Sequence, residues 1–414
     1  MKRIYCVLLS LLLLAGCSEY ISCPAVNYGT DLMATVQAKD VEKVTDLTGD
    51  APAVTDFGVR LFQQSLDAEK NTLISPLSVL CALAMTANGA DGETLAQMEN
   101  VLGMPVTDLN TYIHSYMSQL PSEKTYRLSL ANSIWFTDDG RFTVNQDFLQ
   151  TNADYYGADM YQLPLDEEAV RAINGWVGDK TEGMIPKVLD TLPRDAIMCL
   201  VNALVFEAEW EDDYESDQVR PMRFNMGDDD SIVTDMLLST EGLYLEDEQA
   251  TGVIKYYDDK AYAFVALLPN EDVSVTDYVA SLTGEHLQEM LANPTEVRVY
   301  TAIPKFETGF SVEMNEILAD MGMEQAFDGT RADFSRMGQS TEGNIHIDRV
   351  IHKTFISVGE KGTQAGAATV VVTADGAAMV DENAKTVYLT RPFVYMLIDC
   401  ETNLPFFIGA LMKP

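Results

Sequence analysis

The sequence predicts a single α+β domain in which helices dominate the first half and strands dominate the second. Three observations support this: apolar residues recur at helical spacing mainly before residue 180, apolar runs of strand character become frequent after residue 199, and no strict β-α-β rhythm connects them. A chain of 414 residues with 47% hydrophobic content can bury a sizeable core. We expect one domain over residues 53–414, because no internal repeat or Pro-rich break interrupts this part.

The predicted elements follow from the spacing of apolar residues. Helical stripes, each of which predicts a packing face, occur at 77–85, 148–156, 169–177 and 314–321. Apolar runs rich in β-branched and aromatic residues predict strands at 128–136, 199–206, 262–268, 296–304, 347–358, 393–398 and 405–412.

The N-terminus has the pattern of an export signal. Lys2 and Arg3 precede an apolar run at residues 7–14, which is too short to span a bilayer as a mature helix. Leu14-Ala15-Gly16-Cys17 is similar to a bacterial lipobox, which implies that residues 1–16 are a lipoprotein signal peptide and that Cys17 is acylated. A signal that is cleaved without lipid attachment is the alternative.

Residues 17–52 lack a sustained apolar period and mix Asp, Thr, Ala and Lys, which predicts a lipid-anchored tether in front of the folded body. The lipobox resemblance implies an exported bacterial lipoprotein held at a membrane by Cys17, with the domain outside the cytoplasm. Ser18 resembles the pattern that permits delivery to an outer membrane, whereas the periplasmic or cell-surface face stays open.

Charge and cysteine content exclude several partners. With 27 basic and 64 acidic residues the net charge is -37, which repels nucleic acid and heparin-like polysaccharides. The cysteines that remain after removal of Cys6 and acylation of Cys17 show no CxxC or Cys/His spacing typical of zinc; they are Cys23, Cys81, Cys199 and Cys400. We therefore expect no metal site and no cofactor, and a monomer.

A segment near the C-terminus combines the properties of a loop and of a strand. Residues 362–368 are almost all small and uncharged, and β-formers follow at 369–373. An ordinary polar loop does not need such residues. A strand that enters a packed sheet does, because bulky or charged groups at buried positions are costly. From the local sequence alone a flexible Gly/Ala linker is the alternative.

Several segments resemble, in order and spacing, the serpin family of protease inhibitors. They lie at 71–98, 130–132, 173–183, 201–210, 268–269, 304–306, 318–323, 332–335 and 350–353, and continue into the small-residue segment at 360. The match spans nearly all of 53–414. It implies an α+β serpin fold with a large central antiparallel-rich sheet, two smaller sheets, about nine helices and an exposed reactive loop at about 360–390.

The resemblance implies a single-use suicide inhibitor of serine or cysteine endopeptidases, not an enzyme. The protease cleaves the reactive loop and forms an acyl-enzyme, and the loop then inserts into the central sheet and traps the protease covalently. A non-inhibitory serpin acting as a binding or carrier protein is the alternative. A hydrolase is disfavoured, because the chain has neither a G-x-S-x-G elbow nor an H-E-x-x-H helix.

The family's functional regions are carried over residue by residue. Those matching its hinge are Glu360, Lys361, Gly362, Thr363, Ala365, Gly366, Ala367, Ala368 and Thr369. Those matching its shutter, which would pin two central strands through a buried hydrogen-bond cluster, are Ser75, Ser78, Asn202 and His352. Trp210 and Lys305 match its breach, where insertion begins. A core histidine without a gating role is the alternative for His352.

The reactive bond is predicted by counting along the loop. The family spacing from Gly362 implies Gly376-Ala377, with Ala378, Met379 and Val380 as alternatives, while counting back from Pro392 points near Asp381. Small residues suit an elastase-like protease, and Met379 also suits a chymotrypsin-like or subtilisin-like protease. No Arg or Lys lies between Gly362 and Asn383, so we expect no trypsin-like target.

Overall fold

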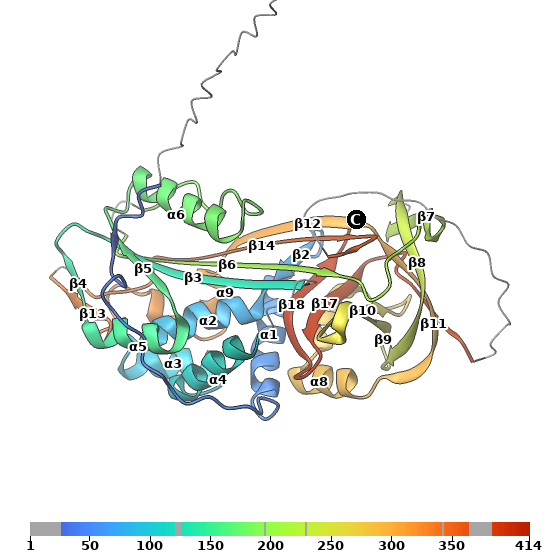
Figure 1. The fold of residues 1–414 in the computed structure, drawn as a ribbon, viewed down its shortest axis with the longest axis horizontal. Helices are drawn as coiled ribbons and strands as arrows, with labels where there is room; N and C mark the ends of the chain where they lie inside the picture. The colour runs from blue at the N-terminus through green and yellow to red at the C-terminus, as the bar shows by residue number, and fades with distance from the viewer. Residues whose placement is uncertain (1–25, 121–125, 194–195, 228–229, 342, 364–382) are drawn as a thin grey trace, which may run out of the picture.

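The structure is a computed structural model that describes residues 26–120, 126–193, 196–227, 230–341, 343–363 and 383–414. Within these residues the chain forms nine α-helices and three sheets, so that the predicted α+β class is confirmed. Figure 1 shows a long central sheet with helices on both faces and a second, strand-rich region at one end.

The central sheet has seven strands and is mostly antiparallel, with parallel pairing only between β3 and β5 and between β6 and β14. Its order is β1 (Thr30–Asp31), β5 (Asp159–Gln162), β3 (Tyr126–Phe136), β6 (Met198–Glu209), β15 (Gly362–Thr363), β14 (Arg349–Gly359) and β12 (Phe306–Glu313).

The second sheet has nine strands and includes the most apolar segments of the chain. Its order is β16 (Lys385–Tyr388), β11 (Thr295–Pro304), β8 (Asp230–Glu246), β9 (Ala250–Tyr256), β10 (Tyr262–Pro269), β17 (Phe393–Asp399), β18 (Leu404–Leu411) and β2 (Thr72–Ile74), with β7 (Val219–Gly227) paired to β8. Every residue of β10 and β18 is buried, which explains their continuous apolar sequences. A two-stranded ribbon of β4 (Phe142–Val144) and β13 (Gly338–Ser340) completes the sheets.

Most helices lie on one face of the central sheet. These are α1 (Ala51–Ser65), α2 (Pro76–Ala87), α3 (Gly92–Leu102), α4 (Val106–Gln119), α5 (Gln146–Tyr156) and α9 (Asn315–Asp320) (Figure 1). On the opposite face α6 (Glu167–Lys180) covers the sheet through a separate apolar cluster that includes Trp135 and Trp176. The helices α7 (Val275–Ser281) and α8 (Gly284–Ala292) accompany the second sheet. All twelve residues of α2 are buried, which explains why apolar side chains occur on every side of this helix.

The segment before α1 lies along the body. Thr30 and Asp31 pair with β5, and Tyr28 donates a hydrogen bond to Asp179 of α6. Farther along, the Lys39 amide donates to Asp154 and the Val44 amide to Ser115. The described part of the predicted tether, residues 26–50, is therefore in contact with the domain rather than separate from it.

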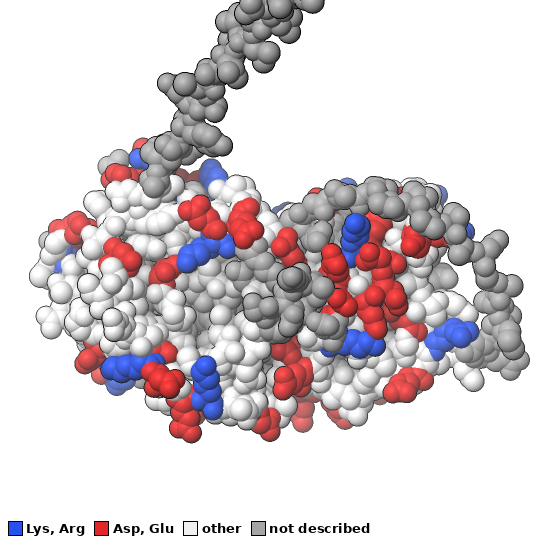
Figure 2. All heavy atoms as spheres, viewed as in Figure 1, with Lys and Arg blue, Asp and Glu red and all other residues white. Residues whose placement is uncertain are grey.

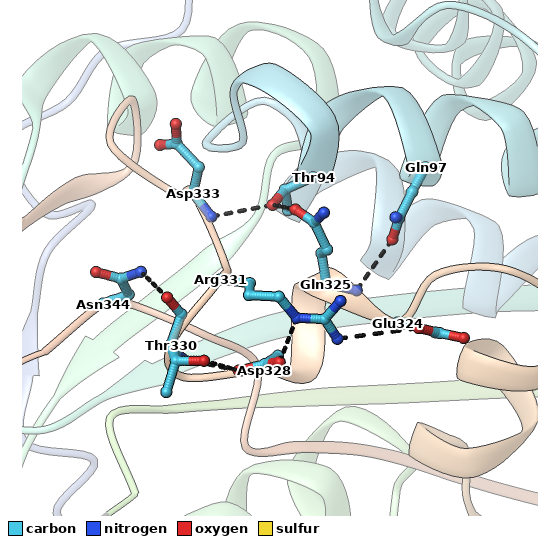
Figure 3. A network of polar contacts seen from close by, with 9 residues as sticks. All are labelled: Thr94, Gln97, Glu324, Gln325, Asp328, Thr330, Arg331, Asp333 and Asn344. Atoms are coloured by element: carbon cyan, nitrogen blue, oxygen red, sulfur yellow. Dashed lines mark hydrogen bonds and ion pairs between the residues drawn. The ribbon is translucent and has the colours of Figure 1, made fainter.

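A polar network connects α3 to η3 (Gln325–Phe327) and to the loop that follows it, far along the chain (Figure 3). The Gln325 amide donates to Gln97 at 3.0 Å, and the Asp333 amide donates to Thr94 at 3.0 Å. Asp328 accepts hydrogen bonds from Thr330 and Arg331, which closes the turn. These hydrogen bonds stabilise the fold by holding η3 and its following loop against α3.

Acidic side chains are spread over both the helical and the strand-rich parts of the visible face (Figure 2). This distribution agrees with the net charge of -37. It leaves no broad basic surface on that face for a polyanion to bind.

Candidate functional site

The centre of the long sheet contains a slot between two strands. β6 and β14 are paired in parallel from Cys199 with Arg349 to Ala203 with Lys353, and the pairing stops there. Further along the two strands, residues 204–206 of β6 and 355–357 of β14 are not paired with each other and line a small cavity. We call this region the slot. Its two strand edges carry backbone donors and acceptors that a further strand could pair with.

The far end of the slot is occupied by the beginning of the small-residue segment. Gly362 and Thr363 form β15, which pairs antiparallel with β14 and with β6 at the same time. Thr363 lies opposite Val358 on one side and Ala208 on the other, and it is only 1% exposed. The first two residues of the small-residue segment are therefore part of the central sheet.

Gly362 is required by this geometry. Its φ of 143° lies in the region that favours glycine, and a Cβ atom there would lie 2.0 Å from the Ala208 carbonyl oxygen. We expect Gly362→Ala to displace β15 from the slot, with a red shift and a change in intensity of the fluorescence of Trp210, which bonds to this turn. Gly359, whose Cβ position is open, provides the control as Gly359→Ala; equal spectra for wild type and Gly362→Ala would contradict the prediction.

The hydroxyl of Thr363 is hydrogen-bonded to Tyr257, which is one member of a stacked aromatic pair. Tyr257 and Thr363 share a hydrogen bond between their side-chain oxygens, and the Tyr257 ring stacks on Trp210 with centroids 4.5 Å apart. Burial raises the pKa of Tyr257 well above its usual value, so its hydroxyl stays protonated and able to donate. The ammonium of Lys255, itself 3% exposed and paired with Glu241 at 3.1 Å, lies 5.2 Å from the Trp210 ring centroid.

The turn that leads into β15 is held by several bonds. Trp210 Nε1 donates to the Gly359 carbonyl at 2.9 Å, and its backbone amide donates to Lys361 at 2.9 Å. Lys305 binds Glu360 at 2.6 Å. Partial burial alone would raise the pKa of the Glu360 carboxyl, but the hydrogen bond from Lys305 leaves it below its usual value. Because both side chains are about one-third exposed, this pair contributes less than about 1 kcal/mol.

A buried polar cluster lies where the β6–β14 pairing ends. The Ser75 amide donates to His352 Nε2 at 3.0 Å, and Ser78 Oγ donates to Asn202. Asn202 and His352 are direct partners in the β6–β14 register, so the cluster joins both strands to the start of α2. All four side chains are 2% exposed or less. The structure thus brings together Ser75, Ser78, Asn202 and His352, as the resemblance implies.

His352 gives this cluster a pH dependence. Burial lowers the pKa of His352 to about 3, from 6.5 in the unfolded chain, because a charged ring would be desolvated there. The neutral ring accepts the hydrogen bond from the Ser75 amide. Between these two values the unfolded state binds more protons, so stability is complete above pH 6.5 and falls on acidification.

We expect His352 to account for a loss of about 3 kcal/mol of unfolding free energy between pH 7 and pH 4. His352→Gln, which keeps an acceptor for the Ser75 amide, should remove this part of the decrease in unfolding free energy with falling pH. Denaturant unfolding of the wild type and of His352→Gln across this pH range measures the decrease in each protein. Parallel curves of unfolding free energy against pH would show that His352 is not a buried neutral ring in the native state.

The predicted site residues outside the described residues are Cys17 and, in the loop, Ala365, Gly366, Ala367, Ala368, Thr369, Gly376, Ala377, Ala378, Met379 and Val380. Their predicted roles stay predictions.

Two residues of the site were missed by the sequence reasoning. Asn132 of β3 accepts a hydrogen bond from Asn202 at 2.5 Å, which extends the polar cluster to a third strand. Tyr257 is the partner of Thr363. Asn132 belongs to the segment 130–132 that resembles the family, but its contact with Asn202 follows only from the β3–β6 register, and an isolated tyrosine such as Tyr257 carries no signal of its own.

Taken together, the site is a sheet with an unfilled strand position, a small-residue segment that has begun to enter it, and a polar cluster that closes the other end. This arrangement leaves one strand position of the central sheet available to a further strand.

Comparison with known proteins assigns the family. Residues 52–414 match the family model described as Serpin (serine protease inhibitor), and the chain belongs to the serpin family. It is 30% identical to human Serpin B8 over 86% of this chain and 97% of that protein. It is 28% identical to the leukocyte elastase inhibitor of Xenopus tropicalis over 87% of this chain and 98% of that protein.

The solved structures of tengpin, a thermophilic serpin, are also similar. The native state has a TM-score of 0.90 at 43% identity and covers 94% of this chain and 100% of tengpin. The latent state has a TM-score of 0.78 at 42% identity and covers 89% and 99%. The present fold therefore agrees better with the native than with the latent form.

Proposed function

We propose that this chain is a single-use inhibitor of serine endopeptidases that acts by loop cleavage, acyl-enzyme trapping and insertion of the loop into the slot. The observation that carries the proposal is β15. Gly362 and Thr363 are paired with both edges of the slot, so that the following residues can extend an antiparallel ladder without a new nucleation step.

The proposed reaction cuts a loop that is fixed to the domain at both of its ends. The protease serine attacks the scissile carbonyl, and the new C-terminal fragment leaves with its amine. Before cleavage the loop is tied at Thr363 and again at β16, which restrains it from filling the slot. After cleavage the N-terminal part, still esterified to the protease, is free to insert and to carry the protease away from the cleavage position.

Inhibition then depends on a competition between insertion and deacylation. Each residue that enters the slot pairs its backbone with β6 and β14, which favours insertion. Small side chains at alternate buried positions keep insertion fast, and Thr363 is the first of these. The uncleaved form is in this view kinetically trapped rather than the most stable state of the chain.

The sequence of the loop supports an elastase-like or subtilisin-like target. Small residues surround the predicted Gly376-Ala377 bond, and no basic residue is present between 362 and 383. Similarity to a leukocyte elastase inhibitor supports the same class. Cysteine endopeptidases, which also form an acyl-enzyme, belong to the proposed range of targets.

The test is incubation of the purified chain with an elastase, with subtilisin and with a papain-like cysteine protease. We expect an SDS-resistant adduct with at least one of them, whose mass is the sum of the protease and the chain less the released C-terminal peptide, and the N-terminus of that peptide identifies the cut. Active-site-blocked protease is the control. Cleavage of the loop without an adduct for every protease would contradict inhibition and favour the carrier function.

We further propose that Cys17 anchors the chain as a lipoprotein. No helix among the described residues is long and apolar enough to cross a membrane. Labelled palmitate should be incorporated by the wild type in a bacterial host and not by Cys17→Ser. Incorporation into both would exclude Cys17 as the attachment point.

A further inference from the structure

A second cavity, which shares no lining residue with the slot, lies beside the second sheet. It has a volume of about 340 Å³ and is formed by the end of α4, the turn from β9 to β10 and the turn from β17 to β18. This volume is in the lower range of small-molecule sites. Nothing in the insertion mechanism uses it.

The cavity has a buried aromatic wall with an unsatisfied hydroxyl. Tyr116 and Tyr262, which line it, are 2% and 1% exposed. Within the described part of the chain the Tyr116 hydroxyl has no hydrogen-bond partner of acceptable geometry. A buried polar group without a partner is rare, and it indicates a place where another molecule supplies the bond. Burial raises the pKa of Tyr116 well above its usual value, and the neighbouring Asp399 carboxylate, which approaches the hydroxyl without forming a hydrogen bond of acceptable geometry, adds to this, so the hydroxyl stays neutral.

The charged groups of the cavity are predominantly acidic. Asp399 and Glu401 line it, and among the described lining residues only Lys260 is basic. The Lys260 ammonium is already engaged, 2.8 Å from Glu211 and 5.4 Å from the Tyr256 ring centroid. Asp399 Oδ1 accepts the amides of Glu401 and Thr402, whereas its Oδ2 takes part in neither of these bonds. The cavity therefore presents acceptors and negative charge next to aromatic rings.

We propose that this cavity binds a small organic molecule that carries a primary ammonium group. The ammonium would donate to Asp399 Oδ2 and to the Tyr116 hydroxyl oxygen and would interact with a tyrosine ring. Leu47 and Leu120 would contact the apolar part of the molecule. A quaternary ammonium has no N–H to donate to these acceptors, so a primary amine is the better fit.

A metal ion fits the site less well. The described residues contain no group of three or more His, Cys, Asp or Glu side chains arranged to hold one. Burial, together with the nearby Asp399, raises the pKa of Cys400 to about 12, which keeps the thiol protonated and a poor ligand.

The test is a calorimetric titration of the purified chain with 2-phenylethylamine at pH 7, compared with 2-phenylethanol, which has the same ring but no charge. We expect saturable one-site binding of the amine and affinity for the alcohol weaker by about tenfold or more. Equal affinity for both compounds, or no binding of the amine, would overturn the proposal.

Two variants and a matched control locate the site. Asp399→Asn keeps the Oδ1 acceptor of the turn but removes the charge, and should weaken amine binding about tenfold. Glu248→Gln neutralises an exposed carboxylate at the other end of β9 and should leave binding unchanged. An equal loss in both variants would show a general charge effect and overturn the site.

Tyr116→Phe provides an independent measurement that does not depend on the turn. It should weaken amine binding severalfold and at the same time raise the melting temperature of the unligated chain, because an unpaired buried hydroxyl is removed. A lower melting temperature would show that the hydroxyl has a protein partner, and unchanged amine affinity would exclude it from the site; either result contradicts the proposal.

Discussion

Thr363→Arg is expected to convert the proposed inhibitor into a substrate while leaving the fold intact. Thr363 is 1% exposed between β6 and β14, and its hydroxyl is bonded to Tyr257. An arginine there cannot be buried without a partner, so β15 would leave the slot and insertion would have to begin from a displaced hinge. A delay of insertion by even 1.4 kcal/mol in the barrier, about tenfold in rate, lets deacylation compete.

The measurement is the number of inhibitor molecules consumed per protease molecule inhibited. We expect this ratio to rise by about tenfold or more in Thr363→Arg, with cleaved chain replacing adduct on denaturing gels. Thr363→Val is the matched control, because it keeps the volume and loses only the bond to Tyr257. It should remain an inhibitor. An unchanged adduct yield for Thr363→Arg would refute the assignment of Gly362 and Thr363 as the hinge.

Cleavage of the loop is expected to raise the thermal resistance of the chain substantially. The slot edges around 204–206 and 355–357 gain a complete antiparallel partner when the loop inserts. Roughly ten new ladder hydrogen bonds at about 1 kcal/mol each would stabilise the product by about 10 kcal/mol. For a domain of this size that corresponds to a rise in melting temperature of roughly 13 °C.

Differential scanning calorimetry before and after limited proteolysis measures this rise. A protease that cuts the loop without forming an adduct is the suitable reagent. Cleaved Thr363→Arg serves as the comparison, since its insertion is impaired and its melting temperature should rise less. If cleavage of the wild type left the melting temperature unchanged, the uncleaved state would not be metastable, and the proposed inhibitory function would fail.

Much of the fold could be predicted from the sequence. The predicted helices correspond to α2, α5, α6 and α9, and the predicted strands to β3, β6, β10, β11, β14, β17 and β18. These are long segments with one apolar face or with complete burial, so that their local pattern reports their environment directly. The sequence pattern did not predict α1, α3, α4, α7 and α8, the strands β7, β8, β9 and β12, or the short strands β1, β2, β4, β5, β13 and β16. Part of β7 and β8 is exposed, which weakens the pattern.

The sequence by itself determined the family, the small-residue segment that we propose as the hinge, and the residue types that form the polar cluster, because each depends on motifs whose order and spacing are local properties of the chain. Only the tertiary structure decided that Tyr257 is hydrogen-bonded to Thr363 and Asn132 to Asn202, and that residues 26–50 lie along the folded domain. It also decided that Tyr116 and Asp399, 283 residues apart, line one cavity. Such contacts arise from strand register and side-chain packing between distant segments, and neither leaves a periodic signal in the sequence.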